Sequence, residues 1–176
     1  MNDLFKITYF CEERGTPFHF DMEDYADVSP LYLCMERFLS AYQGEFVLKI
    51  GDIDLTFEFR PDLSTIFDEL PNALETLTSE TASPVELYFF EQGTDLTLWI
   101  ERHLDIISLS FEKGPAVGKR FTDLTEERFS VPSHVFLSEW IRFAQSVLEL
   151  LSNFQPDIAN DESYQEYRNR LMSLAP

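Results

Sequence analysis

Four carboxylates within seven positions form the densest group of side chains in this sequence that could do chemistry: Asp21, Glu23, Asp24 and Asp27. Calcium takes oxygen ligands of this kind, but an EF-hand loop also needs glycine at its sixth position and glutamate at its twelfth, and neither follows here. The group is therefore a solvated acidic loop or a contact for a basic partner, with calcium binding as a third interpretation. Tyr25 favours the contact, because amphipathic aromatic side chains are enriched at interfaces.

A second set of carboxylates falls among predicted strands in the middle of the chain. Glu91, Asp95 and Glu101 could supply the carboxylate pair of a glycosidase, which needs two carboxyl groups about 5–10 Å apart in a cleft. Glu91 and Asp95 flank a tight turn, so exposure to solvent is the simpler interpretation. Trp99 falls on the polar side of its strand, where it is either covered by a helix or loop or exposed as an anchor for a partner.

One segment superficially resembles a phosphate-binding loop. Residues 114–120 read GPAVGKR, whereas the phosphate loop has four residues between its glycines and a serine or threonine after its lysine. Here the spacing is one residue short, Arg120 replaces the hydroxyl, and Pro115 removes an amide donor. The segment is therefore predicted to be an exposed loop rich in turn residues.

The cysteines and histidines form no metal-binding or nucleophilic pattern. No CxxC or HxxxH pair occurs, and His19, His103 and His134 are far apart in the sequence. Cys11 and Cys34 have apolar neighbours and are too few for a disulfide framework, so buried free thiols are expected. We predict no catalytic residue, no metal and no cofactor.

The charge balance of the chain is strongly acidic. Its 13 Lys and Arg face 32 Asp and Glu, which gives a formal net charge of −19. Nucleic acids and anionic membranes are therefore poor partners, because phosphate binding needs clustered Lys and Arg. The acidity serves either solubility or the attraction of a basic protein, in which opposite charge accelerates association.

Length and composition predict one domain over residues 1–176. Hydrophobic residues make up 44% of the chain, which argues against disorder, and no repeat or long linker divides it. The start of the sequence lacks the basic and apolar regions of a signal peptide, and no stretch approaches the roughly 20 apolar residues of a membrane span. We therefore expect a soluble, cytoplasmic protein.

Alternating side chains predict two hairpins in the first third of the chain. Residues 4–11 pair with 17–22 in the first, and residues 46–50 pair with 53–60 in the second. Between the hairpins, residues 31–43 carry apolar side chains at helical spacing, although the same stretch could pair as a strand.

The middle of the chain predicts an interrupted helix and then a meander. Asp62 is a suitable N-cap for apolar residues at helical spacing over 63–77, and Pro71 should kink or divide that helix. Residues 112–132 are expected to be irregular. Before them, three strands form an antiparallel meander at residues 85–91, 96–102 and 106–111.

The last third of the chain is predicted to be helical. A broad apolar stripe covers residues 136–154, and the helix that carries it begins at Ser133 or Ser138. Residues 161–174 form a short closing helix. The predicted architecture is α+β: an antiparallel sheet of hairpins and a three-strand meander, covered on one face by helices that include the long C-terminal helix.

Two segments look like parts of small acidic bacterial proteins that are uncharacterised. They are VELYFFEQGTDLTLWIER at residues 85–102 and FLSEWIRFAQSVLELL at residues 136–151. Some proteins with this layout of a meander followed by a helix occur beside secreted toxins and act as their immunity partners. The resemblance implies a non-enzymatic protein that neutralises a partner by binding it, and it transfers no site residue to this chain.

The leading hypothesis is an acidic binding protein, of the immunity type, that neutralises a basic protein partner. One alternative is a hydrolase that acts on a small polar or carbohydrate substrate through paired carboxylates, and it requires a deep pocket with at least two acidic groups of raised pKa. Another is a structural subunit of a larger assembly. The candidate partner-binding residues are Asp21, Glu23, Asp24, Tyr25, Asp27 and Trp99.

Overall fold

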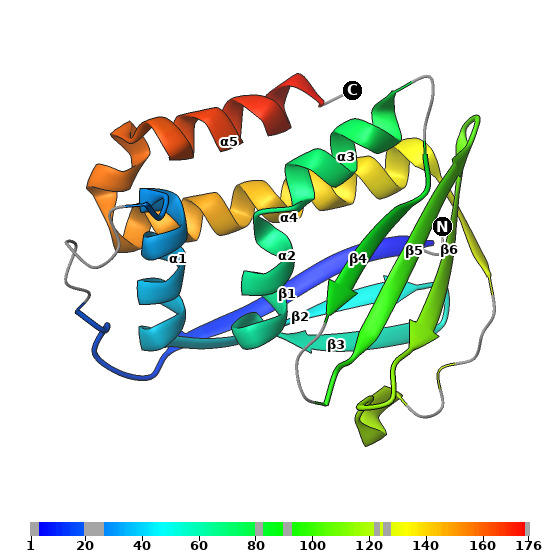
Figure 1. Ribbon diagram of the computed structural model, residues 1–176, viewed down its shortest axis with the longest axis horizontal. Helices are drawn as coiled ribbons and strands as arrows, with labels where there is room; N and C mark the ends of the chain where they lie inside the picture. The colour runs from blue at the N-terminus through cyan, green and yellow to red at the C-terminus, as the bar shows by residue number, and fades with distance from the viewer. Residues whose placement is uncertain are drawn as a thin grey trace.

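The fold is α+β, as predicted, and consists of two antiparallel sheets packed against helices (Figure 1). The computed structural model describes residues 4–19, 27–79, 83–89, 93–121, 124 and 128–174. Within these ranges, none of the helices combines the length and the apolar character needed to cross a bilayer.

Sheet A has three strands in the order β1 (Phe5–Glu13), β2 (Tyr42–Ile50) and β3 (Ile53–Glu58). The predicted hairpin of β2 and β3 is confirmed, although β3 ends at Glu58 and not at residue 60. Its turn uses Gly51, whose φ of 60° is a conformation that glycine adopts without a steric penalty. Alternate side chains of β2 are buried, so one face of sheet A contributes to the core.

The predicted hairpin between residues 4–11 and 17–22 is wrong. Residues 17–19 are not in a strand, and 20–22 lie outside the described residues. β1 pairs instead with β2, so that Phe5 lies opposite Ile50 and Ile7 opposite Leu48. β1 pairs with β2 because β2 is a nine-residue strand, and its alternation of buried side chains matches that of β1.

Of residues 31–43, for which helix and strand were both considered, 31–41 belong to helix α1 (Pro30–Ala41) and the last two to β2. The hydroxyl of Ser29 caps it by accepting from the amide of Tyr32, and Pro30 occupies the first turn, where it removes no helical hydrogen bond. The chain leaves the helix directly into β2 at Tyr42.

The predicted interruption of the next helix is confirmed. After a turn segment, η1 (Phe59–Leu63), the chain forms α2 (Ser64–Phe67) and then α3 (Leu70–Thr78), which has Pro71 in its first turn. The predicted N-cap role of Asp62 is wrong. Its carboxylate is buried and accepts from the amide of Glu58 at 2.9 Å, because the chain already coils before α2 begins.

Sheet B contains the predicted meander and one further strand. Its order is β4 (Val85–Phe89), β5 (Leu96–His103), β6 (Ile106–Lys113) and β7 (Phe129–Pro132), and a short 3₁₀ turn, η2 (Lys119–Phe121), precedes β7. β7 lies in the stretch expected to be irregular. Its four residues are too few to show alternation, and pairing with β6 defines the strand.

Helix α4 (Ser133–Phe154) begins at Ser133, the first of the two predicted starts. A 3₁₀ turn, η3 (Pro156–Asn160), connects it to the closing helix α5 (Glu162–Ser173), which is also confirmed. The carboxylate of Asp161 caps α5 by accepting from the amide of Ser163 at 2.9 Å.

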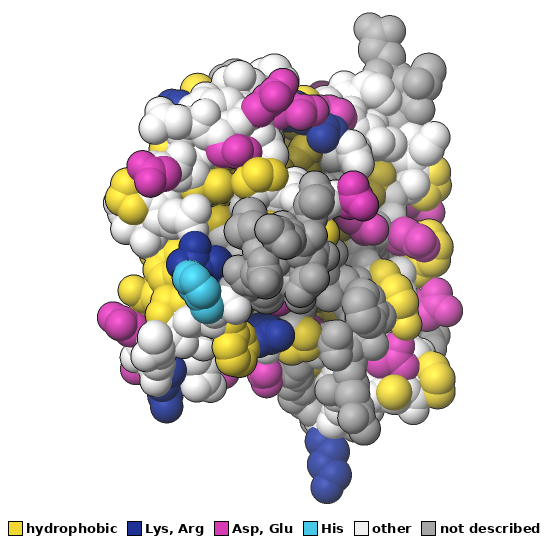
Figure 2. Space-filling model, turned by 60° about the vertical axis from the view of Figure 1, so that its left-hand side comes forward, with side chains coloured by type: hydrophobic (Ala, Val, Ile, Leu, Met, Phe, Trp, Pro, Cys, Tyr) yellow, Lys and Arg dark blue, Asp and Glu magenta, His cyan; other side chains and the backbone are white. Residues whose placement is uncertain are grey.

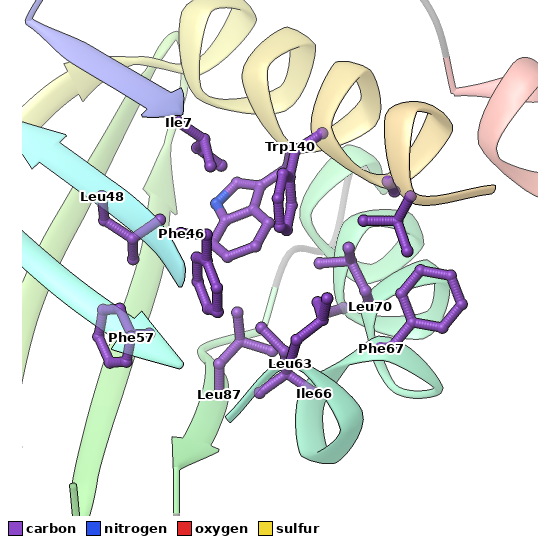
Figure 3. Close-up of a cluster of buried hydrophobic side chains, with 14 of the residues drawn as sticks. Ile7, Phe46, Leu48, Phe57, Leu63, Ile66, Phe67, Leu70, Leu87 and Trp140 are labelled. Carbon is purple, nitrogen blue, oxygen red and sulfur yellow. The ribbon is translucent and has the colours of Figure 1, made fainter. Parts of the chain in front are cut away.

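Trp140 of α4 lies at the centre of the core (Figure 3). The figure shows it projecting towards Ile7 and Phe46 of sheet A, with Leu63 and Leu70 from the segment of η1 to α3 on the other side. The buried side chains of both sheets and of the helices form one continuous cluster.

Phe57 of β3 joins the two sheets through its ring. The centroid of its ring lies 5.2 Å from that of Phe46 in sheet A, 4.4 Å from Phe89 in sheet B and 5.5 Å from Phe121 in η2. Contacts between aromatic rings at these distances add to the stabilisation from burial alone. The junction of the sheets therefore depends on this side chain.

Helix α4 is also pinned to the free edge of sheet A. The amide of Ile7 donates to the carboxylate of Glu139 at 2.9 Å, and the carbonyl of Ile7 accepts from the guanidinium of Arg142. The two side chains form an ion pair of 2.8 Å. Together they satisfy both backbone groups of Ile7 that point away from β2.

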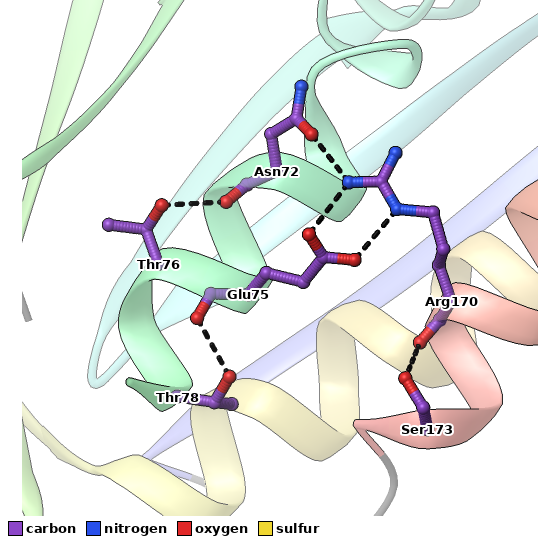
Figure 4. Close-up of polar contacts among 6 residues, drawn as sticks. All are labelled: Asn72, Glu75, Thr76, Thr78, Arg170 and Ser173. Carbon is purple, nitrogen blue, oxygen red and sulfur yellow. Dashed lines mark hydrogen bonds and ion pairs between the residues drawn. The ribbon is translucent and has the colours of Figure 1, made fainter. Parts of the chain in front are cut away.

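An ion pair fastens α5 to α3 (Figure 4). The guanidinium of Arg170 donates to both carboxylate oxygens of Glu75, at 2.7 and 2.8 Å, and also to the side chain of Asn72. The hydrogen bonds from Arg170 lower the pKa of Glu75 below its ordinary value of 4.5. A two-point contact of this kind holds the two helices in a defined orientation.

We expect Glu75→Gln to lower the free energy of unfolding by about 0.5 kcal/mol at neutral pH, since the pair is largely exposed. Because the pKa of Glu75 is lower in the folded state, its contribution is complete above the unfolded pKa of about 4.5 and is lost as the pH falls through the folded pKa. Urea unfolding at several pH values will measure this: the difference between variant and wild type should shrink towards acid pH. Glu149→Gln, an exposed position on α4, is the control, and an equal pH-dependent loss there would contradict the prediction.

Candidate functional site

Sheet B has one buried face and one that carries polar and aromatic side chains. The buried face packs on the core with residues such as Leu98 and Leu109, and the helices lie on that side (Figure 1). The strand register aligns the other side chains in rows across the sheet. We call this second surface the outer face, and it is made by Glu86, Tyr88, Thr97, Trp99, Glu101, Ser108, Ser110, Glu112 and Ser130.

Trp99 is near the middle of the outer face. Glu86 of β4 and Ser110 of β6 lie directly opposite it on the neighbouring strands. Its indole N–H donates to the carboxylate of Glu112 at 3.0 Å, and Glu112 is exposed. Trp99 is half-buried, so part of its ring is available to a partner.

The surroundings of Trp99 are small and acidic. Serine and threonine side chains occupy most of the remaining positions, so the indole and the ring of Tyr88, which is 44% exposed, are the largest groups of the face. Of the three glutamates, Glu101 has a cationic neighbour, Arg128 at 3.9 Å, and the imidazole of His103 lies 3.5 Å away. The result is a surface with an aromatic centre and an acidic border.

Asp95 is a structural carboxylate. Its place beside a turn suggested that it is exposed, and this expectation is wrong. It is buried, with a φ of 34°, and accepts from the hydroxyl of Tyr88 at 3.1 Å and from the amide of Ala116 at 2.6 Å. The hydrogen bond with Asp95 raises the pKa of Tyr88. Of the carboxylates considered for a glycosidase pair, Asp95 is thus engaged in the fold, Glu101 lies beside Arg128, and Glu91 lies outside the described residues.

The segment that resembled a phosphate loop closes against the turn before β5. The amide of Gly114 donates to the carbonyl of Asp95 at 2.8 Å, and the amide of Gly118 donates to the carbonyl of Gly93 at 2.9 Å. Neither glycine could carry a side chain. A Cβ at Gly114 would overlap the Asp95 carboxylate, and a Cβ at Gly118 would overlap the carbonyl of Gly93. The glycines allow two backbones to approach, and the amide of Ala116 is already occupied by Asp95.

We expect Gly118→Ala to destabilise the protein by about 1–3 kcal/mol, because the new methyl group overlaps a backbone oxygen that cannot rotate away. Thermal unfolding will show this as a lower melting temperature. Gly15→Ala is the matched control: a Cβ there meets no atom within 4 Å, and its stability should equal or slightly exceed that of the wild type. If both variants are equally stable, the close contact of the two loops is not present in solution.

A groove between α1 and α2 gathers a second group of acidic side chains. It has a volume of about 460 Å³ and is lined by Tyr32 and Glu36 on one side and by Asp68 and Glu69 on the other. Although Asp68 reaches solvent, desolvation raises its pKa, and the charges of Glu69 and Glu36 raise it further. Arg60, which also lines the groove, lies 3.7 Å from Glu36. The paired-carboxylate alternative requires two acidic groups with raised pKa, and in this groove Asp68 is one such group.

Of the residues predicted to bind a partner, the structure describes Asp27 and Trp99, and these two lie far apart. Asp27 is exposed just before α1, and α1 and sheet B are at opposite ends of the molecule (Figure 1). Asp21, Glu23, Asp24 and Tyr25 lie outside the described residues. Glu86 and Glu112 were missed, because their closeness to Trp99 depends on the register of three strands. Glu36 and Asp68 could not have been paired, because the packing of α1 against α2 leaves no sequence pattern.

Burial raises the pKa of both thiols. It raises the pKa of Cys34 to about 11, and this buried side chain lies 3.9 Å from the carbonyl of Leu151. Cys11 is half-buried, and its pKa is also raised by desolvation. Across the described part of the chain, no three His, Cys, Asp or Glu side chains converge closely enough to hold a metal ion.

Comparison of the chain with family models, with curated proteins and with solved structures found no match.

Proposed function

We propose that this chain is a non-enzymatic acidic protein of the bacterial cytoplasm that binds a basic protein and neutralises it, as an immunity-type inhibitor does. The observation that carries the proposal is the position of the carboxylates. Among the described residues, Asp62 and Asp95 are the buried ones, and the other Asp and Glu side chains all reach solvent. The large negative charge is thus presented to the surroundings of the molecule.

The distribution of this charge suits the capture of a basic protein. Figure 2 shows Asp and Glu side chains spread over one face, with hydrophobic side chains between them and Lys and Arg side chains in separate spots. With a net charge of −19, the field of the whole molecule attracts cationic proteins before contact. Attraction of this type speeds association and is screened by salt over about 8–10 Å.

Charge alone does not hold a complex together, and the outer face supplies the contacts that can. Exposed aromatic side chains provide much of the binding energy of protein interfaces, and Trp99 and Tyr88 lie together on this face. Such a protein would neutralise an enzyme by covering the basic surface with which the enzyme holds its substrate.

Affinity capture from the native cell extract, followed by calorimetry with each purified candidate, tests the proposal. We expect a basic protein that binds with one-to-one stoichiometry, with affinity that falls by at least about tenfold between about 50 and 500 mM NaCl. Its activity should disappear at equimolar amounts of the acidic chain. The proposal fails if no basic protein forms a stoichiometric complex, or if the affinity does not depend on salt.

A further inference from the structure

We propose that Trp99, with Glu86 and Glu112, forms a receptor for an arginine side chain of the basic partner. This inference rests on the proposed function and assigns the docking surface to the outer face of sheet B. The guanidinium would stack on the exposed part of the indole while one of the carboxylates accepts its N–H groups.

The hydrogen bonds and register of the strands hold these groups in place. The bond of 3.0 Å from the Trp99 indole to Glu112 restrains the ring, and Glu86 lies opposite Trp99 on β4. On the other side, Ser110 is too small to cover the indole. Glu86 belongs to the edge strand β4, and Trp99 and Glu112 belong to the central strands β5 and β6. Because the backbone of all three is fixed by strand pairing, little conformational entropy is lost on binding.

Arginine fits this arrangement better than lysine for two reasons. Its planar guanidinium stacks on an aromatic face, and its fork of N–H donors matches a carboxylate. The ammonium group of lysine is compact and strongly hydrated, so it gains less from either contact.

The charges around the receptor favour a cationic occupant. Glu101, two residues along β5 from Trp99, already has the guanidinium of Arg128 at 3.9 Å, so its charge is partly compensated. Neither Glu86 nor Glu112 has an ion pair among the described residues, and both are exposed. The uncompensated charge is therefore on the two glutamates that flank the indole.

Titration with a hexa-arginine peptide, followed by NMR, tests the receptor directly. The chain has two tryptophans, so it gives two indole N–H signals, and Trp99→Phe assigns them. We expect the Trp99 signal to shift and saturate, while that of the buried Trp140 remains in place. Trp99→Ala should weaken binding about tenfold, and Glu86→Gln and Glu112→Gln should each weaken it several-fold.

Two controls decide the specificity of the receptor. Glu45→Gln removes an equal charge from an exposed position on sheet A, and it should change the affinity less than about twofold. A hexa-lysine peptide should bind several-fold more weakly than hexa-arginine. Equal effects of Glu45→Gln and Glu86→Gln, or equal affinity for both peptides, would show attraction by general charge and overturn the proposal.

Two further outcomes also overturn it, and they separate it from the proposed function. If the Trp99 signal shifts with protein concentration alone, the occupant is a second copy of the chain. If a captured basic partner binds Trp99→Ala as tightly as the wild type, the docking surface lies elsewhere and the proposed function still stands. Failure to capture any partner removes the proposed function, whatever the peptide does.

Discussion

Trp140→Ala is expected to lower the free energy of unfolding by about 3–5 kcal/mol, a large part of the stability of an ordinary domain. The side chain is fully buried, and its ring packs near those of Phe136 and Phe143, with centroids 6.3 and 6.1 Å away. Truncation to alanine removes the indole from a position between sheet A and the helices, where the surrounding elements are too rigid to close the cavity.

Urea unfolding monitored by circular dichroism measures this loss, and Trp99→Ala is the matched control. Because Trp99 is half-buried on the outer face, its substitution by alanine should lower the free energy of unfolding by about 1 kcal/mol or less. Trp140→Phe should fall between them, because its smaller ring keeps much of the packing, and the indole N–H that it removes has no hydrogen-bond partner among the described residues. Equal losses for the two alanine variants would contradict the placement of Trp140 at the centre of the core.

Phe57→Ala should cost a similar amount, about 3–5 kcal/mol, and it tests whether the two sheets unfold together. The ring of Phe57 contacts aromatic side chains of both sheets and of η2, so its removal leaves a cavity at their junction. The sequence predicts one domain, and a single domain loses both sheets in one transition.

Two single-tryptophan proteins report on the two parts of the fold. In Trp140→Phe the remaining Trp99 senses sheet B, and in Trp99→Phe the remaining Trp140 senses the contact of α4 with sheet A. We expect the unfolding midpoint of each protein to be the same whether it is measured by fluorescence or by circular dichroism. This agreement between the two probes should hold both with and without Phe57→Ala. Separate midpoints would mean that the sheets unfold independently, and the prediction of one domain would then be wrong.

Local patterns were sufficient to predict most elements of this fold. The alternation in β3 and β5, the helical stripe of α4 and the interruption at Pro71 each involve neighbours in the sequence, and the structure confirms all of them. The choice of helix for α1 was open from spacing alone, and the cap by Ser29 together with Pro30 favours it.

Pairings between distant segments could not be predicted in the same way. β1 could satisfy its backbone with any strand of matching alternation, and the nearest candidate in the sequence was the wrong one. Asp62 was predicted to be an N-cap and Asp95 to be exposed, because the amides of Glu58 and Ala116 from which they accept hydrogen bonds become their neighbours only after folding. The same limit applies to the site: Trp99 was identified from alternation, whereas its flanking glutamates required the register of three strands.

The attachment of α4 to Ile7 has a consequence for how this molecule behaves when crowded with others of its kind. An edge strand with open amides and carbonyls is a template on which a strand of another chain can add, and fibrils grow by this route. At Ile7 both groups are occupied by Glu139 and Arg142, so an incoming strand would first have to displace an ion pair. The long helix thus shields part of the sheet from aggregation.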